Sequence, residues 1–259
     1  MKIGIIGAGN LGKAIIDCMQ KNNIPIMATG RTPSTYRNTE ITADNKKLAE
    51  ESGIIILAVK PNSMQEVLKE IKSHTKDKLI ITFAAGLKIS FYEKRTAPDA
   101  RIVRVMTNLA IKNQKGMSAY ILSGTCTEQD KNTTEKLLSY LGKHTEVEQE
   151  DLLDVITGVS GSAIAYFIKI MDIFRQSAAK HGIPKNQAKE IIMETVKGSL
   201  SLMENTGQNS NQLISSIASK GGTTEQGLKE LKERDLENIL SSTIEKTIEK
   251  CRQVGDNYD

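Results

Sequence analysis

A glycine-rich segment near the start of the chain constrains the fold more than any other feature. It reads GAGNLGKA from Gly7 to Ala14, and the short apolar run Lys2–Ile6 precedes it. The apolar residues that follow recur at helical spacing, which predicts a helix opening at the last glycine. Gly7, Gly9 and Gly12 fit the pattern G-x-G-x-x-G, whose glycines permit a tight turn, close approach of a pyrophosphate and close helix–strand packing. This strand–loop–helix unit predicts a dinucleotide-binding α/β domain.

The same segment also fits a second phosphate-binding pattern. Gly7, Gly12 and Lys13 match G-x-x-x-x-G-K, the beginning of a P-loop. A P-loop continues with Ser or Thr, whose hydroxyl binds magnesium, but Ala14 occupies that position here. The missing hydroxyl disfavours ATP hydrolysis and favours the dinucleotide interpretation.

Composition disfavours several other classes of protein. The chain has 259 residues, of which 39% are hydrophobic and 25% charged, as in globular proteins. The net charge of +4 is spread along the chain, and no basic run is dense enough to predict nucleic-acid or membrane-surface binding. No apolar run approaches the ~20 residues of a membrane span. Because the chain begins with a strand pattern and not a signal peptide, we expect a cytoplasmic protein.

Cysteine and histidine residues give no sign of a metal site. The three cysteines are few and far apart, which predicts neither a disulfide framework nor a zinc site: Cys18, Cys126 and Cys251. The three histidines have no second ligand at metal spacing: His74, His144 and His181. We therefore expect no metal, and the sequence supports no Ser-His-Asp or Cys-His catalytic arrangement.

The first 150 residues alternate predicted strands and helices. Strands are expected at 2–6, 25–29, 54–59, 79–83 and 101–106, with further strands at 117–122 and 145–147. This alternation predicts a doubly wound, mostly parallel sheet of the Rossmann type. Three strands end in VKP (59–61), AAG (84–86) and VMTN (105–108). Since ligands of such sheets bind beyond the carboxyl ends of the strands, these segments, including Asn108, should line the cofactor cleft.

The end of the second strand indicates which dinucleotide binds. A site for NAD usually has an acidic residue about 20 residues after the glycines, where it binds the ribose 2′-hydroxyl. Here the stretch reads ATGRTPSTYR, and the first acidic residue is Glu40. Arg31, followed by Thr32, stands where a 2′-phosphate would lie, and its fork of donors suits a phosphate. A solvated loop arginine is the alternative. NADPH is therefore the preferred cofactor, with NADH as the second candidate.

From about Asp151 the apolar residues follow helical spacing. They are too many for one exposed face, which predicts that this region buries surface against a second copy of the chain. We expect two domains: a dinucleotide-binding domain at 1–150, and an all-helical domain for substrate binding and dimerisation at 151–259.

The segment SKGGTT (Ser219–Thr224) interrupts two of the predicted helices. Two glycines and two hydroxyls ahead of a helix present N–H groups that suit a carboxylate. An ordinary loop with a threonine N-cap explains the segment equally well.

Taken in order, the motifs GAGNLGKAI, LAVKP, AAG, RVMTN, SGSAIAY (160–166) and GGTT resemble the pyrroline-5-carboxylate reductase family. The resemblance covers essentially the whole chain. It implies an oxidoreductase that reduces the cyclic imine L-1-pyrroline-5-carboxylate to L-proline by hydride transfer from NADPH or NADH, the last step of proline biosynthesis. It also implies a homodimer interlocked through the helical domain, which often assembles further.

The resemblance assigns roles to individual residues. The pyrophosphate would lie on Gly7, Ala8, Gly9, Asn10 and Leu11, and the adenosine phosphate on Arg31 and Thr32. The nicotinamide and its ribose would contact Val59, Lys60, Pro61, Ala84, Ala85 and Gly86. The substrate carboxylate would bind the backbone of Ser219, Gly221, Gly222, Thr223 and Thr224. The hydroxyl of Thr224 would face the ring nitrogen, which makes Thr224 the candidate catalytic residue.

Four positions depart from the family pattern. Thr107, Ile164 and Lys220 stand where the family usually has proline, and Ala163 where it usually has glycine. Because proline fixes the backbone angle φ, we expect looser loops around the pocket. Two alternatives therefore stay open: reduction of another cyclic imino acid, such as the six-membered ring analogue, and a non-catalytic relative that binds nucleotide.

Overall fold

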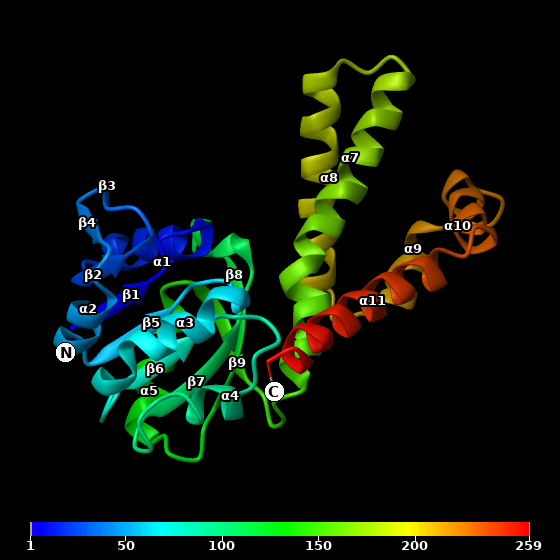
Figure 1. The fold of residues 1–259 in the computed structure, drawn as a ribbon. Coiled ribbons are helices and arrows are strands. Elements are labelled where there is room, and N and C mark those ends of the chain that lie inside the picture. Colours follow the sequence, from blue (N-terminus) through cyan, green and yellow to red (C-terminus); the bar gives the residue numbers. More distant parts are fainter. Residues whose placement is uncertain (1, 259) are drawn as a thin grey trace. The chain divides into compact units, whose positions relative to one another are not determined.

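A computed structural model describes residues 2–258 of the chain (Figure 1). The chain forms two compact units. The first unit extends through Ala163 and resumes at Lys246, and the second is Ile164–Glu245. The C-terminal part of the last helix therefore belongs to the same unit as the N-terminal sheet.

Within the described residues, the first unit holds one nine-stranded sheet with the strand order β3-β4-β2-β1-β5-β6-β7-β8-β9. Neighbouring strands are parallel except for the pairs β3–β4 and β7–β8. This confirms the predicted doubly wound, mostly parallel sheet. The strands are β1 (Ile3–Ile6), β2 (Ile26–Thr29), β3 (Ser34–Tyr36), β4 (Thr39–Thr42), β5 (Ile54–Leu57), β6 (Leu79–Thr82), β7 (Arg101–Met106), β8 (Gly116–Leu122) and β9 (Gly142–Glu146).

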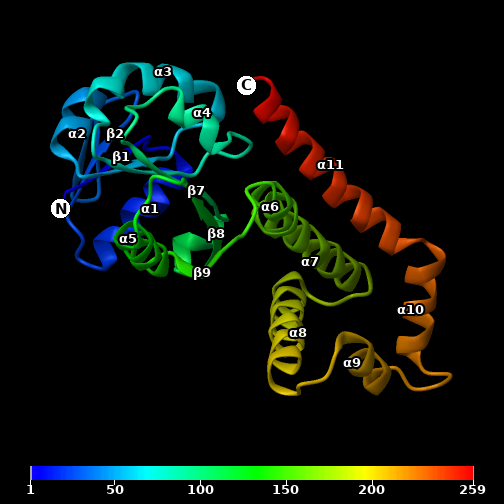
Figure 2. The same cartoon turned by 90° about the horizontal axis from the view of Figure 1, so that it is seen from below.

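Helices cover both faces of this sheet, with α1 and α5 on one side and α2, α3 and α4 on the other (Figure 2). Alternate residues of β5 face the two sides: Ile54 and Ile56 join one hydrophobic cluster, and Ile55 and Leu57 the other. Burial on both faces explains why this strand is a continuous apolar run. The helical segments are α1 (Asn10–Lys21), α2 (Asn45–Glu51), α3 (Pro61–Ile71), η1 (Lys72–His74), α4 (Ile89–Glu93), η2 (Leu109–Asn113), α5 (Glu128–Ser139), α6 (Leu152–Ile156) and the π-helical turn η3 (Thr157–Ser162).

The second unit is helical, as predicted. Its helices are α7 (Ala163–Lys180), α8 (Lys185–Asn205), α9 (Ser210–Ile217), α10 (Thr223–Glu233) and the first half of α11 (Leu236–Asp256). Gly182 follows α7 with a φ of +91°, and Pro184 is the N-cap of α8. Many large apolar side chains stay exposed in the single chain, among them Phe167, Ile168, Ile173, Phe174, Met203 and Ile217. An apolar surface of this extent marks an interaction site.

The helix Leu152–Lys180 is long and apolar enough to cross a membrane, judged by length and composition only. The expectation that no apolar segment approaches a membrane span is wrong for this helix. That expectation counted unbroken apolar runs, whereas here a small-residue turn and a few polar residues interrupt a long apolar helix. Buried helices of globular proteins share these properties, so the segment is weak evidence for a membrane.

The four residues that depart from the family pattern lie in different surroundings. Thr107 is buried, and its hydroxyl lies 2.8 Å from that of Ser118, at hydrogen-bond distance. Ala163 and Ile164 lie in the first turn of α7, where the helix itself fixes the backbone. Lys220 is exposed in the loop before α10.

Candidate functional site

The three glycines of the first loop each meet a different steric demand. Gly7 has a φ of +108°, and a Cβ there would lie 2.8 Å from the backbone of Ala58. A Cβ on Gly12 would overlap the carbonyl oxygen of Gly7, so only glycine lets α1 begin this close to β1. At Gly9, by contrast, a Cβ would have no neighbour within 4 Å. Of the three glycines, Gly9 is the one whose backbone is open to close approach by a ligand.

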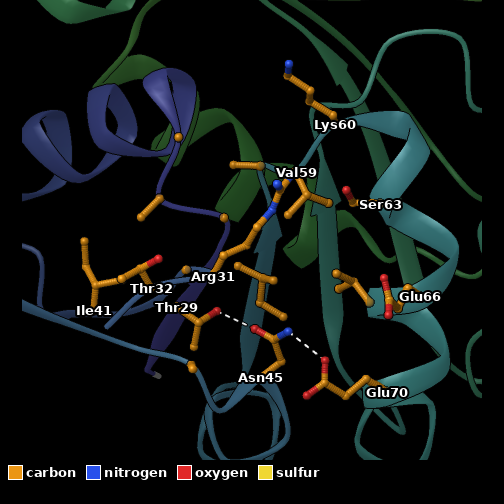
Figure 3. A pocket seen from close by; sticks show the side chains of 18 of the residues that line it. Thr29, Arg31, Thr32, Ile41, Asn45, Val59, Lys60, Ser63, Glu66 and Glu70 are labelled. Atoms are coloured by element: carbon orange, nitrogen blue, oxygen red, sulfur yellow. Dashed lines mark hydrogen bonds between the residues drawn. The ribbon is translucent and has the colours of Figure 1, made fainter. Parts of the chain in front are cut away.

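This loop borders a cavity of about 640 Å³ in the first unit (Figure 3). Of the predicted cofactor residues, the cavity is lined by Gly7, Ala8, Gly9, Arg31, Thr32, Val59 and Lys60. These residues come from the loops after β1, β2 and β5, three neighbouring parallel strands. The structure therefore brings together the glycine loop and the arginine that the sequence placed near the adenosine phosphate.

The cavity also has polar residues that sequence analysis missed. The Thr29 hydroxyl donates a hydrogen bond to Asn45 Oδ1 at 2.6 Å, and Asn45 Nδ2 donates to Glu70 Oε2 at 2.8 Å (Figure 3). These two hydrogen bonds connect the end of β2 to α2 and α3. Asn45 belongs to none of the motifs that the sequence showed; it directly follows Asp44, the N-cap of α2.

Charged groups of both signs face the cavity. Its lining has three basic side chains, Lys13, Arg31 and Lys60, and two acidic ones, Glu66 and Glu70. The Nζ atom of Lys13 lies 5.0 Å from the centre of the Tyr36 ring, which holds this cation beside the hairpin β3–β4. The excess of basic groups, together with the open backbone at Gly9, fits a phosphate-bearing ligand such as NADP.

Several predicted cofactor residues do not line this cavity. Asn10 and Leu11 form the first turn of α1, and Pro61 is the first residue of α3. Ala84, Ala85 and Gly86 follow β6, and Asn108 follows β7, where its Nδ2 donates to the hydroxyl of Ser160 at 3.1 Å. Since β1, β5, β6 and β7 are parallel neighbours, all these segments still lie at one edge of the sheet.

The predicted substrate residues belong to the second unit. Ser219 and Gly222 close a turn in which the Gly222 N–H donates to the Ser219 carbonyl at 2.9 Å. Gly222 is the N-cap of α10 and makes no side-chain cap, so the alternative with a threonine N-cap is wrong. Thr223 and Thr224 form the first turn of the helix. The Gly221 N–H donates to Glu225 Oε2 at 2.7 Å, so one of the predicted donors already has an acidic partner.

Comparisons with known proteins agree with this geometry. Residues 150–254 match the family described as pyrroline-5-carboxylate reductase dimerisation, and residues 2–86 match the family described as NADP oxidoreductase, coenzyme F420-dependent. The pyrroline-5-carboxylate reductase of Aquifex aeolicus is 32% identical over 261 residues, which covers 98% of this chain and 97% of that protein.

Two solved structures are similar over almost their whole length. The pyrroline carboxylate reductase of Plasmodium falciparum with NADP bound has a TM-score of 0.94 at 27% identity and covers 98% of both chains. The 1-pyrroline-5-carboxylate reductase of Streptococcus pyogenes has a TM-score of 0.90 at 28% identity, again with 98% of both chains covered.

The fold and its glycine-loop cavity thus define an NADP-dependent oxidoreductase with an N-terminal Rossmann-type domain and a helical dimerisation segment. More narrowly, the chain belongs to the pyrroline-5-carboxylate reductase family. The predictions of the family, the fold class, the enzyme class and the use of NADP are confirmed.

The contrast between two glycines gives a test of the loop. We expect Gly9→Ala to keep the melting temperature of the parent but to raise the Kd for NADPH at least about tenfold, because its methyl group occupies the approach of the pyrophosphate. Gly12→Ala should instead lower the free energy of unfolding by about 1–3 kcal/mol, since the methyl group forces α1 away from β1. Thermal unfolding and a fluorescence titration with NADPH measure both effects.

Parent affinity for NADPH in folded Gly9→Ala would contradict this assignment of the loop. Gly124→Ala is the matched control, because Gly124 is exposed and a Cβ there would also have no neighbour within 4 Å.

Proposed function

We propose that the protein reduces L-1-pyrroline-5-carboxylate to L-proline with NADPH, the last step of proline biosynthesis. The observation that carries this proposal is the likeness, over nearly the full chain, to reductases of this name, including one solved with NADP. The glycine-loop cavity and its basic lining fit the cofactor independently of that likeness.

NADPH, when bound, supplies the hydride that adds to the imine carbon, and a proton on the ring nitrogen completes the amine. The pyrophosphate would be held by Gly7, Ala8, Gly9, Asn10 and Leu11, and the adenosine 2′-phosphate by Arg31 and Thr32. The nicotinamide and its ribose would contact Val59, Lys60, Pro61, Ala84, Ala85 and Gly86, and Asn108 would line the cofactor cleft. The protein aligns the nicotinamide ring with the ring of the cyclic imine in the orientation that hydride transfer requires, which is catalysis by proximity.

The substrate carboxylate would bind the backbone N–H groups of Ser219, Gly221, Gly222, Thr223 and Thr224. The first-turn N–H groups of α10 suit an anion because they have no partner within the helix. Glu225 accepts from the Gly221 N–H, so a substrate that uses this donor must displace the Glu225 carboxylate. The hydroxyl of Thr224 would orient the ring nitrogen of the imine or relay its proton.

We propose a homodimer that covers the exposed apolar side chains of the second unit. The match of residues 150–254 to a dimerisation family supports a second copy as the partner, and not a bilayer, for the apolar helix Leu152–Lys180. The same proposal assigns dinucleotide binding to residues 1–150 and assigns substrate binding and dimerisation to residues 151–259. We further propose that the protein works in the cytoplasm and binds neither nucleic acid nor membrane.

A direct assay tests the reaction. Purified protein is mixed with NADPH and L-1-pyrroline-5-carboxylate, the oxidation of NADPH is followed by absorbance, and the product is identified by mass spectrometry. We expect proline as the product. Faster reduction of the six-membered ring imino acid would favour the diverged homologue, and NADPH binding without oxidation by either substrate would favour the non-catalytic relative.

Arg31 should determine the choice between the two dinucleotides. We expect Arg31→Ala to lower kcat/KM for NADPH relative to NADH by about 10- to 100-fold, because a charged hydrogen bond to the 2′-phosphate is worth about 1.5–3 kcal/mol. Steady-state kinetics with both cofactors measure this ratio. Arg37→Ala is the control, since Arg37 lies in the turn of the hairpin β3–β4 that follows Arg31, pairs with Asp17 and does not line the cavity. An unchanged ratio in Arg31→Ala would remove Arg31 from the phosphate site.

Thr224 should act on turnover and not on cofactor binding. We expect Thr224→Ala to lower kcat about 100-fold while the Kd for NADPH stays the same, because the hydroxyl meets only the reacting imine. Thr224→Ser keeps the hydroxyl and should restore most of the activity. Equal kcat in Thr224→Ala and the parent would show that the hydroxyl has no part in the reaction.

A further inference from the structure

The last turns of α11 pack closely against the loop after β6, largely through backbone atoms. Gly86 in this loop has a φ of +82°, and a Cβ there would lie 2.6 Å from the carbonyl oxygen of Cys251. A Cβ on Gly255 would lie 2.5 Å from the carbonyl oxygen of Gly86. Neither Gly86 nor Gly255 can therefore be replaced by a residue with a side chain without displacing the other segment. A shift of the helix must move the loop.

One buried arginine connects the two sides of this contact. Arg104 of β7 is 2% exposed, and its guanidinium donates to Glu150 Oε1 at 3.0 Å and to Asp154 Oδ1 at 2.6 Å. Glu150 Oε1 also accepts from the backbone N–H of Ile89, at the far end of the loop that contains Gly86. Asp154 Oδ1 also lies 3.5 Å from the Cys251 thiol of α11.

The ionisation states of this cluster favour these contacts. Although burial opposes its charge, the carboxylates of Asp154 and Glu150 raise the pKa of Arg104, which therefore stays charged. Burial raises the pKa of the Cys251 thiol, which therefore keeps the proton that it donates to Asp154. A single arginine thus holds both the loop and the helix that lies on it.

The aromatic residue after α11 fixes the same end of the helix. The ring of Tyr258 lies edge-on to that of Phe91 in α4, with 6.0 Å between the centroids, and the Tyr258 carbonyl accepts from Arg95 at 3.4 Å. Helix α4 directly follows the loop. The helix end is therefore held at α6, at the loop and at α4.

From this geometry we infer that the last turns of α11, through Gly255 and the Arg104 cluster, are a positioning element for the Ala84–Gly86 loop and so set the alignment of the nicotinamide ring. The inference rests on the proposed function, in which Ala84–Gly86 contacts the nicotinamide and the adenosine half of the cofactor lies in the cavity beyond β1, β2 and β5. Gly255 and Arg104 act through that loop and are positioning residues. Their effect is therefore on hydride transfer.

The variant Gly255→Ala tests the inference. Its methyl group displaces the loop at Gly86, and we expect kcat to fall about 10- to 100-fold, the effect of a small misplacement of reacting groups. The Kd for NADPH should change less than about twofold, since the cavity supplies the main phosphate contacts. The primary isotope effect on kcat with NADPH deuterated at the transferred position should rise, because hydride transfer becomes slower than the other steps. Gly124→Ala is the matched control and should show none of these changes.

A structural role alone predicts a different result. If Gly255 only stabilised the fold, the variant would melt at a lower temperature, but the folded enzyme would keep the parent kcat, KM and isotope effect. That result would overturn the inference. If Gly255→Ala does not fold, Val254→Gly replaces it, because the Cβ of Val254 lies 3.1 Å from the position of a Cβ on Gly86 and glycine removes this atom from the contact. Parent kcat and isotope effect in Val254→Gly would likewise overturn the inference.

A second measurement separates this inference from the proposed reaction. The fluorescence of bound NADPH, excited in the absorption band of the reduced nicotinamide where protein side chains do not absorb, reports the surroundings of the nicotinamide. We expect its emission to differ between the parent and Gly255→Ala, and to be the same in Gly124→Ala. If the parent does not reduce the imine, the proposed reaction fails, while this comparison still decides the inference. Identical emission spectra of the parent and Gly255→Ala would refute it.

Discussion

The contact between Gly12 and the Gly7 carbonyl is the constraint on which the cofactor site depends. It lets α1 begin close to the end of β1, where Gly9 and Lys13 line the cavity. The rest of the edge follows from strand order, because β2 and β5 flank β1 and bring Arg31 and Lys60 to the same opening. The close approach of α1 to β1 results from the absence of side chains at Gly7 and Gly12.

Features with a local cause could be predicted from the sequence. The glycine loop, the buried strands and the helical second half each leave a signal within a few neighbouring residues, such as a continuous apolar run or a helical period. Arg31 was found in the same way, because its distance from the glycines fixes its place at the end of β2. The structure confirms these elements and places Arg31 in the lining of the cavity.

Features that depend on distant residues could not be predicted. Asn45 lines the cavity through partners 16 and 25 positions away, and Arg104 meets Asp154 across 50 positions. The hairpin β3–β4 pairs short, mostly exposed strands that lack an apolar pattern. For the same reason, Val59, Lys60 and Gly86 could be named as candidate contacts of the nicotinamide. The contact between Gly86 and α11 could not be predicted.

The return of α11 to the first unit has a consequence for how the protein is made. The surface around Gly86 precedes the second unit in the chain, whereas the residues that cover it, from Lys246 onward, follow the second unit and are synthesised after it. The sheet can assemble while the chain is still being synthesised. The contact between Asp154 and the Cys251 thiol can form only after α11 has been synthesised. The first unit therefore receives its last helical segment only after the whole second unit has been synthesised.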